Sequence, residues 1–256
     1  MSEYFDIHTH ILPHADDGSS SSSESISMLC ALYDEGVKRV VATPHFYATS
    51  DEPEAFLKRR HAAMTRLRDK ISKAAETDCA LLDKLPSIYL GGEVEFFSAM
   101  SNAEILKELC ISGTSFLLVE MPFDTWTQSM AEELYMLTQK QGITPIIAHV
   151  DRYFKFYKTQ MLDEMIDNGI KIQINADAFL RFGTRRRAFD LVRSGRAHFL
   201  GSDTHNMGRR APRFGEATVE IEKRLGSSTL RSIVEESNRL LKNAVPVFKA
   251  GDNADE

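Results

Sequence analysis

The segment Tyr4-Phe5-Asp6-Ile7-His8-Thr9-His10 places two histidines at the end of a short apolar run. Tyr4–Ile7 is predicted to form a β-strand, and residues i and i+2 on a strand point the same way, so His8 and His10 can bind one metal ion together. Five further apolar runs also end in His, Asp or Glu. The residues at those ends are His45, Glu93, Glu120, His149 and the pair Asp203 and His205.

Short apolar runs alternate with helix-like segments along the whole chain. The predicted strands are Tyr4–Ile7, Arg39–Thr43, Ile88–Leu90, Ser115–Val119, Thr144–Ala148, Lys171–Ile174 and His198–Gly201. The predicted helices are Ser25–Glu35, Pro53–Ala75, Trp126–Gln141, Thr159–Asn168, Arg185–Ser194, Pro212–Arg224 and Thr229–Lys242. Strands separated by helices are typical of a parallel sheet with crossover helices. About seven such units favour a single closed or nearly closed β/α barrel; an open doubly wound sheet is the alternative.

The composition is that of one large globular domain. The chain has 256 residues, of which 43% are hydrophobic and 27% charged, which excludes a mostly disordered chain. We expect one domain over residues 1–249 and a short acidic tail over 250–256. The net charge of −6 disfavours a duplex-binding protein, so no nucleic-acid partner is expected.

No apolar stretch reaches the ~18 residues of a membrane span, and the N-terminus lacks the pattern of a signal peptide. We therefore predict a cytoplasmic protein without membrane insertion. The three cysteines, Cys30, Cys79 and Cys110, are far apart and form no CxxC motif. A disulfide framework or a cysteine-based zinc site is therefore not expected.

The strand-end residues predict a metal site. The carboxyl ends of parallel barrel strands meet on one face, and imidazole with carboxylate is a ligand set for Zn²⁺, Mn²⁺ or Fe. Glu93 can bridge two ions through its two oxygens. Of the eight histidines, His14, His61 and His198 lie outside this pattern and are predicted not to be ligands. Asp16 and Asp17 precede Gly18, and a plain turn is a sufficient explanation for Asp16.

Arginines near the predicted metal site indicate a phosphate ester as substrate. Arg152 follows His149 by three residues, and Arg209 and Arg210 follow His205. Guanidinium groups bind the oxygens of a phosphate through paired hydrogen bonds. The spacing from Asp203 favours Arg210 over Arg209 as the residue that faces the site.

The ordered motifs resemble the polymerase-and-histidinol-phosphatase (PHP) superfamily, and within it the bacterial capsule and exopolysaccharide branch of metal-dependent protein-tyrosine phosphatases. The matching stretches are Asp6–Gly18, Ala42–His45, Gly92–Glu95, Leu118–Met121, Ile147–Tyr153 and Gly201–Asn206 with Arg210. Asp16-Asp17-Gly18 and the His-x-x-Arg-Tyr stretch that begins at His149 favour this branch over the histidinol phosphatases.

This resemblance implies a (β/α)₇-like distorted TIM barrel with three divalent ions at the carboxyl ends of its parallel strands. By carry-over, one ion takes His8, His10, Glu93 and Asp203; the second takes Glu93, Glu120 and His149; the third takes Asp17, His45 and His205. Manganese is the expected metal, with Fe, Zn or Mg as alternatives. Arg152 and Arg210 would bind the phosphoryl group as catalytic and substrate-binding residues. The implied partner is the tyrosine-rich tail of an autophosphorylated bacterial tyrosine kinase that controls capsular or exopolysaccharide synthesis.

The expected reaction is in-line attack on phosphorus by a hydroxide that bridges two ions, with phenolate as the leaving group. Clustered cations lower the pKa of bound water from 15.7 toward about 7 and neutralise the phosphoryl oxygens. No cysteine nucleophile is required. Four aromatic residues follow ligand positions and are predicted to pack in the core or to wall the substrate ring: Phe46, Tyr47, Phe123 and Trp126.

Three other functions stay open on the sequence alone. The first is another metal phosphoesterase, such as a histidinol-phosphate or other small-molecule phosphatase, with the same metal site. The second is a barrel amidohydrolase, which also begins with His-x-His after its first strand; Asp203-x-His205 and the arginines oppose it. The third is a metal-stabilised binding module. A purely structural role needs neither open coordination positions nor Arg152 and Arg210, which argues against this function.

Overall fold

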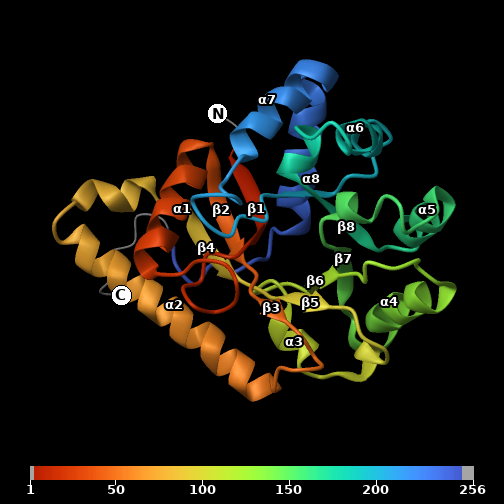
Figure 1. Cartoon of the computed structure of the whole chain (residues 1–256), viewed down its shortest axis with the longest axis horizontal. Coiled ribbons are helices and arrows are strands. Elements are labelled where there is room, and N and C mark those ends of the chain that lie inside the picture. Colours follow the sequence, from red (N-terminus) through yellow and green to blue (C-terminus); the bar gives the residue numbers. More distant parts are fainter. Residues whose placement is uncertain (1–2, 250–256) are drawn as a thin grey trace.

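The computed structural model describes residues 3–249 and contains parallel strands surrounded by helices (Figure 1). The predicted tail, 250–256, lies outside the described residues. The strands are β1 (Tyr4–Thr9), β2 (Val37–Ala42), β3 (His45–Phe46), β4 (Ser87–Leu90), β5 (Glu93–Glu95), β6 (Phe116–Glu120), β7 (Thr144–Ile147), β8 (Lys171–Asn175) and β9 (Phe199–Gly201). They form a sheet ordered β1-β2-β4 and a sheet ordered β3-β5-β6-β7-β8-β9.

Two of the predicted strand regions continue as a second strand after a short break. Pro44, which has no N–H to donate, lies between β2 and β3, and Gly91-Gly92 lies between β4 and β5. The second strand of each pair joins the larger sheet, where His45 is paired with Glu93 and Glu95 with Glu120. The sequence analysis did not predict β3 or β5, because strands of two or three residues carry no usable pattern.

The strands curl into a distorted barrel, as predicted. An isolated parallel bridge joins Thr9 to Thr204 next to β1 and β9. The backbone N–H of Asp203 donates to the carbonyl of His8 at 2.8 Å, and that of His10 donates to the carbonyl of Thr204 at 2.9 Å. These contacts bring the first and last strands together and place their ligand residues side by side. An open doubly wound sheet would have kept the edge strands apart.

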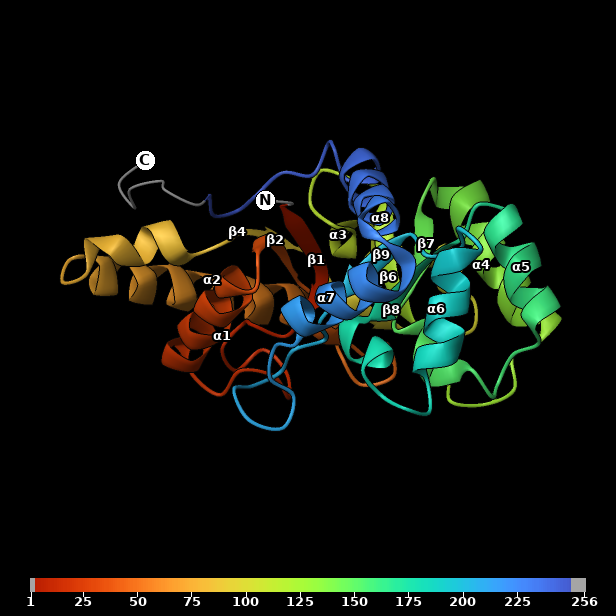
Figure 2. The same cartoon turned by 90° about the horizontal axis from the view of Figure 1, so that it is seen from above.

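Helices cover the outside of the sheet (Figure 2). They are α1 (Ser22–Asp34), α2 (Pro53–Ala75), α3 (Leu106–Leu109), α4 (Gln128–Gln141), α5 (Thr159–Asp167), α6 (Arg185–Arg193), α7 (Phe214–Leu225) and α8 (Ser227–Leu240). Helix α3 was not predicted, and α1 begins three residues before its predicted start because Ser21 caps it by accepting from the N–H of Glu24. Gly142 ends α4 with φ of 69°, which glycine adopts without strain.

Apolar side chains fill both the inside of the barrel and the layer between strands and helices. Val41, Leu118, Ile146 and Phe199 come from four strands and pack in one cluster. The neighbours of Leu118 on β6 belong instead to the larger cluster that includes the helices, as expected from the two-residue alternation of a strand. In residues 3–249 no helix combines the length and apolar character needed to cross a bilayer.

Candidate metal centre

The structure brings the nine predicted ligand residues together at the carboxyl ends of the strands. His8 lies in β1 and His10 directly after it; His45, Glu93 and Glu120 lie in β3, β5 and β6. His149 follows β7, and Asp203 and His205 follow β9. Asp17 comes from the loop between β1 and α1. Among the described residues, His14, His61 and His198 belong to none of the candidate metal-binding groups, and neither does His149, which instead contacts Glu93.

Glu93 is the centre of the cluster. Its side chain is 1% exposed, and its Oε2 lies 3.0 Å from His8 Nε2, 3.2 Å from His10 Nε2 and 3.1 Å from His45 Nδ1. Its Oε1 lies 2.8 Å from His149 Nε2. A single carboxylate therefore contacts four imidazoles, which is the geometry expected of a ligand shared between ions.

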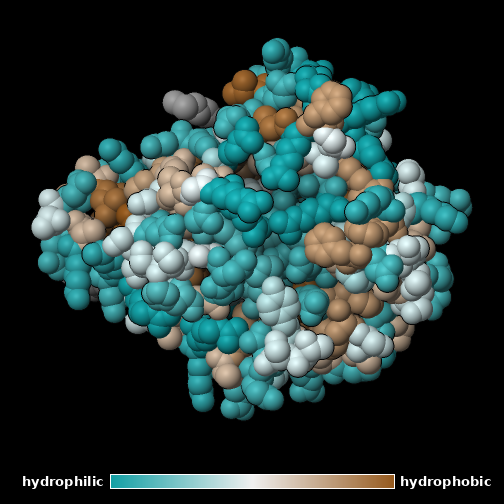
Figure 3. All heavy atoms as spheres, viewed as in Figure 1, coloured by the Kyte–Doolittle hydropathy of each residue, from teal (hydrophilic) through white to brown (hydrophobic). Residues whose placement is uncertain are grey.

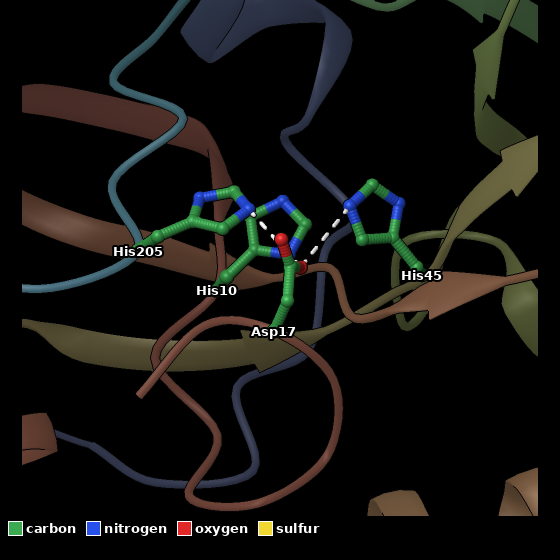
Figure 4. A group of neighbouring side chains, drawn as sticks. All are labelled: His10, Asp17, His45 and His205. Atoms are coloured by element: carbon green, nitrogen blue, oxygen red, sulfur yellow. Dashed lines mark ion pairs between the residues drawn. The ribbon is translucent and has the colours of Figure 1, made fainter. Parts of the chain in front are cut away.

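A second group surrounds Asp17 at the entrance of the site. Asp17 Oδ1 lies 3.4 Å from His205 Nε2 and 3.6 Å from His45 Nε2, and its side chain is 67% exposed. Figure 4 shows the carboxylate of Asp17 pointing toward the rings of His205, His10 and His45, which come from separate parts of the chain. Ligand atoms of these four residues all lie within 4.8 Å of one another.

The donor atoms fit divalent cations. His45 Nδ1, His205 Nε2 and Glu93 Oε2 are buried and make no hydrogen bond. Leaving a buried polar atom unpaired is costly, and cations bound at the neighbouring candidate groups would satisfy these atoms. The other candidate groups are His8 with His10 and Asp203, and His45 with Glu93 and Glu120. Imidazole and carboxylate donors suit Mn, Fe or Zn.

Charge in the cluster follows from burial and mutual contact. Burial alone would raise the pKa of Glu93, but His8, His10 and His149 hold it well below its usual range. Burial would lower the pKa of His10, yet Asp16 and Glu93 raise it to about 10. Burial dominates at His205 and lowers its pKa. Glu93 and Asp203, whose pKa values are both lowered by the neighbouring cationic groups, therefore stay ionised.

Residues behind the ligands hold the rings in place, and the sequence analysis missed most of them. Gln173 Oε1 lies 3.1 Å from His8 Nδ1 and accepts from the backbone N–H of His149 at 2.6 Å. Its side-chain amide donates to Asn175 Oδ1 at 2.8 Å, and Asn175 donates to Asp203 Oδ2 at 3.1 Å. The available signal was Gln173-x-Asn175, which begins on the predicted strand Lys171–Ile174 and ends one residue beyond it, since alternate strand residues share a face.

Asp16 is more than a turn residue, contrary to the sequence-based interpretation. Its Oδ2 lies 2.6 Å from His10 Nδ1 and accepts from the backbone N–H of His45 at 3.0 Å, and its Oδ1 accepts from the N–H of Gly18 at 2.9 Å. A Cβ on Gly18 would lie 2.3 Å from the carbonyl oxygen of His10, so only glycine allows this loop to approach the site.

Two of the candidate ligand residues have a backbone with positive φ, which is uncommon for residues other than glycine. His149 has φ of 30° and Asp203 has φ of 54°. Such conformations persist only where the surrounding structure enforces them, and they concentrate at functional sites. The hydrogen bonds from the backbone of His149 to Gln173 and from that of Asp203 to His8 supply this constraint.

Two arginines contact the same carboxylate at the edge of the cluster. The Nη2 atom of Arg152 lies 3.0 Å from Asp203 Oδ2, and the Nη2 atom of Arg210 lies 2.7 Å from Asp203 Oδ1. Both side chains are about one-third exposed, at 33% and 32%. Arg209 is exposed and makes no ion pair within residues 3–249. The structure thus places Arg210, rather than Arg209, against the cluster.

The four aromatic residues separate into two kinds. Phe46 and Trp126 are buried, at 1% and 4% exposure, and belong to the core. Tyr47 stacks on the ring of His45 with centroids 5.2 Å apart, and Phe123 is 55% exposed while contacting Tyr153. Only Tyr47 and Phe123 are therefore available to a substrate.

Comparisons with known proteins identify the family to which this chain is similar. A family model described as capsular polysaccharide synthesis, CpsB/CapC, matches residues 4–242. Tyrosine-protein phosphatase YwqE of Bacillus subtilis (strain 168) is 32% identical over 244 residues, covering 93% of this chain and 91% of the relative. Tyrosine-protein phosphatase CpsB of Streptococcus agalactiae (serotype III, strain NEM316) is 29% identical over 252 residues, covering 93% and 98%.

A solved structure extends the likeness to three dimensions. It comes from work on YwqE from Bacillus subtilis and CpsB from Streptococcus pneumoniae, described as unique metal-dependent tyrosine phosphatases. The TM-score is 0.77 at 26% identity, covering 96% of this chain and 97% of the other.

Proposed function

The chain belongs to the CpsB/CapC family, and we propose that it is a metal-dependent protein-tyrosine phosphatase that hydrolyses phosphotyrosine in a protein substrate. The observation that carries this proposal is that a cluster of candidate metal ligands lies directly beside two arginines. Eight imidazole and carboxylate side chains gather with Glu93 as candidate ligands, and two arginines contact Asp203 at the edge of this group. The relatives that share this chain length and fold are named tyrosine phosphatases.

The proposed ligands of three divalent ions are His8, His10, Asp17, His45, Glu93, Glu120, His149, Asp203 and His205. When bound, the ions supply an activated water and neutralise charge on the phosphoryl oxygens. Manganese is the metal we propose, because oxygen and imidazole donors suit it. Glu93, in contact with four of the histidines, is the residue that ions would share.

Arg152 and Arg210 are the proposed phosphoryl-binding residues. Each guanidinium group contacts a different oxygen of Asp203 through one nitrogen, so both side chains are held at the edge of the cluster. The remaining N–H groups of each guanidinium can donate to a phosphoryl group. Charge-assisted hydrogen bonds from such donors stabilise the charge that develops on the phosphoryl oxygens. The phenolate that leaves has a parent pKa of about 10, so it needs less help from an acid than an alkoxide would.

The rest of the proposal concerns biological setting. An autophosphorylated bacterial tyrosine kinase that controls capsule or exopolysaccharide synthesis is the proposed partner, in line with the description of the family. A cytoplasmic location is supported by the three cysteines, which are all free, since disulfides are rare there. Residues 1–249 would form the catalytic domain.

The test is hydrolysis of a tyrosine-phosphorylated peptide beside a phosphoserine peptide and histidinol phosphate, with Mn²⁺ and after chelation. Release of phosphate from the phosphotyrosine peptide alone, lost on chelation and restored by Mn²⁺, is the expected result. Faster release from histidinol phosphate would move the function to a small-molecule phosphatase on the same metal site. No release from any substrate would contradict the proposal.

A further inference from the structure

A cleft of about 350 Å³ opens beside the metal centre and is lined by an excess of arginines. Asp203 lines it at the metal centre, and Asp177, which follows β8, lines it as well. Its arginines are Arg152, Arg181, Arg209, Arg210 and Arg213. The carboxylates in its lining are Asp151, Asp177 and Asp203, so cations outnumber them by five to three. Figure 3 shows hydrophilic residues gathered across the middle of this face.

Four of the five arginines are held by carboxylates. Arg152 and Arg210 contact Asp203, as described above. Arg181 and Arg213 both contact Asp177, with Arg213 at 2.7 Å. Arg213 also pairs with Glu216. Asp177 and Asp203 each hold two guanidinium groups, which limits the positions of these four arginines in the cleft.

Arg209 differs from the other four. It lines the cleft and is exposed, yet it forms no ion pair with any residue in the described range 3–249. Arg209 lies next to Arg210 in the loop between β9 and α7. In the part of the chain that the structure describes, Arg209 has no carboxylate partner, and its neighbours in the cleft are two pairs of arginines that each share one carboxylate. The cleft therefore has a positive potential, which an anionic group would neutralise.

We propose that the part of this cleft around Arg209 is a second anion subsite, separate from the phosphoryl-binding Arg152 and Arg210, and that it binds a negatively charged side chain of the substrate peptide close to the scissile phosphotyrosine. This inference rests on the proposed function, because it specifies which phosphotyrosine peptides the phosphatase site would prefer. Because Arg209 lines the same cleft as Arg152, Arg210 and Asp203, it is within reach of residues that neighbour a phosphotyrosine whose phosphate contacts Arg152 and Arg210. The bound group is an anion, which a carboxylate or a second phosphate can supply.

The experiment compares phosphotyrosine peptides that differ only in their flanks: neutral, glutamate-rich, phosphoserine-containing and lysine-rich. Acidic and basic residues are placed on the N-terminal side in one set and on the C-terminal side in another. The enzymes are the Mn²⁺-supplied wild type, Arg209→Ala, Arg209→Glu and the control Arg231→Ala. Arg231 is exposed on α8, outside the cleft.

Arg209→Ala should raise KM for the acidic peptides about three- to fivefold, as for an exposed charge pair, and leave kcat unchanged. Neutral peptides and free phosphotyrosine should be unaffected. Arg209→Glu should reverse the preference toward lysine-rich flanks, and added salt should shrink the difference in the wild type. Comparing KM for the glutamate-rich and phosphoserine-containing peptides shows whether a carboxylate or a phosphate is preferred.

Equal KM values for acidic and neutral peptides in the wild type, or an equal response to Arg209→Ala and Arg231→Ala, would overturn the subsite while leaving the phosphatase function intact. Absence of hydrolysis for every peptide, including the neutral one, would overturn the proposed function and the subsite with it. The neutral peptide therefore separates the two failures.

Discussion

His10 Nδ1 lies 2.6 Å from the carboxylate of Asp16, so the other ring nitrogen of His10 faces Glu93. A carboxylate in this position fixes the orientation of a ligand histidine and raises its basicity. The loop that supplies Asp16 also supplies Asp17, so one short segment both orients a ligand and provides another. This relationship leads to the first prediction.

Asp16→Asn should weaken Mn²⁺ binding about ten- to a hundredfold, the usual cost of losing such a partner. The amide keeps the size of the side chain but removes the charge that His10 contacts. Titration calorimetry with Mn²⁺ on chelator-treated protein measures the effect, with Asp83→Asn, an exposed site, as control. Equal affinity in both variants would show that Asp16 has only a turn role.

Gln173→Leu should reduce both metal affinity and activity while the barrel still folds. The substitution removes the acceptor shared by His8 and the backbone of His149, and it leaves a buried N–H unpaired at a cost of about 1–3 kcal/mol. Urea unfolding gives the stability change and phosphotyrosine hydrolysis the activity change. Gln173→Glu keeps an acceptor and should retain more of both; a reversed ranking would contradict this role.

Asp203→Asn should lower phosphatase activity a hundredfold or more with little change in fold. Asp203 contacts His8, His10 and His205 and holds Arg152 and Arg210, and asparagine tolerates its left-handed backbone. Circular dichroism checks the fold and steady-state kinetics the activity, beside Asp190→Asn on the exposed face of α6. Full activity in Asp203→Asn would remove it from the site.

Adding Mn²⁺ to chelator-treated protein should raise Tm, and the rise should grow with Mn²⁺ concentration. Only the folded chain brings these ligands together, so binding stabilises it by mass action: about 2.7 kcal/mol at a hundred times Kd. A thermal scan over a series of Mn²⁺ concentrations measures this, with Mg²⁺ for comparison. A Tm that does not respond to any divalent ion would contradict the metal centre.

Acid should destabilise the protein partly through His198. Burial, helped by Lys171, lowers its pKa to about 4, and its Nδ1 accepts from the N–H of Ile172 at 3.3 Å. An unfolded histidine has a pKa of about 6.5, so the unfolded state binds a proton that the folded state does not, and stability falls as pH drops from about 6.5 to 4.

His198→Gln keeps a hydrogen-bond acceptor but cannot titrate. Between pH 7 and pH 5 the wild type should therefore lose about 2 kcal/mol more than this variant, measured by urea unfolding in chelator. Comparing the two proteins cancels the titration of the metal ligands, which both share. Parallel stability curves would show that His198 is not the group responsible.

Much of the fold could be read from local pattern. Alternating apolar runs and helical segments predicted the parallel barrel, and strand-end position predicted that His8, His10 and Glu93 would lie together. Such features are local, because a strand sets which side chains share a face and a parallel sheet sets which ends meet. The breaks before β3 and β5 escaped prediction because two or three residues show no periodicity.

The sequence by itself determined the barrel and the candidate ligand residues at its strand ends, since both depend on residue type and spacing along the chain. Only the tertiary structure decided which residues hold these side chains in place and whether Arg209 or Arg210 contacts Asp203. Gln173 links His8 to His149 only because β8 lies between β7 and β9, and Asp16 reaches His10 only through the close turn at Gly18. Arg209 and Arg210 are equivalent in composition and adjacent in sequence. Packing against Asp203 distinguishes them, because contacts between distant segments carry no local signature.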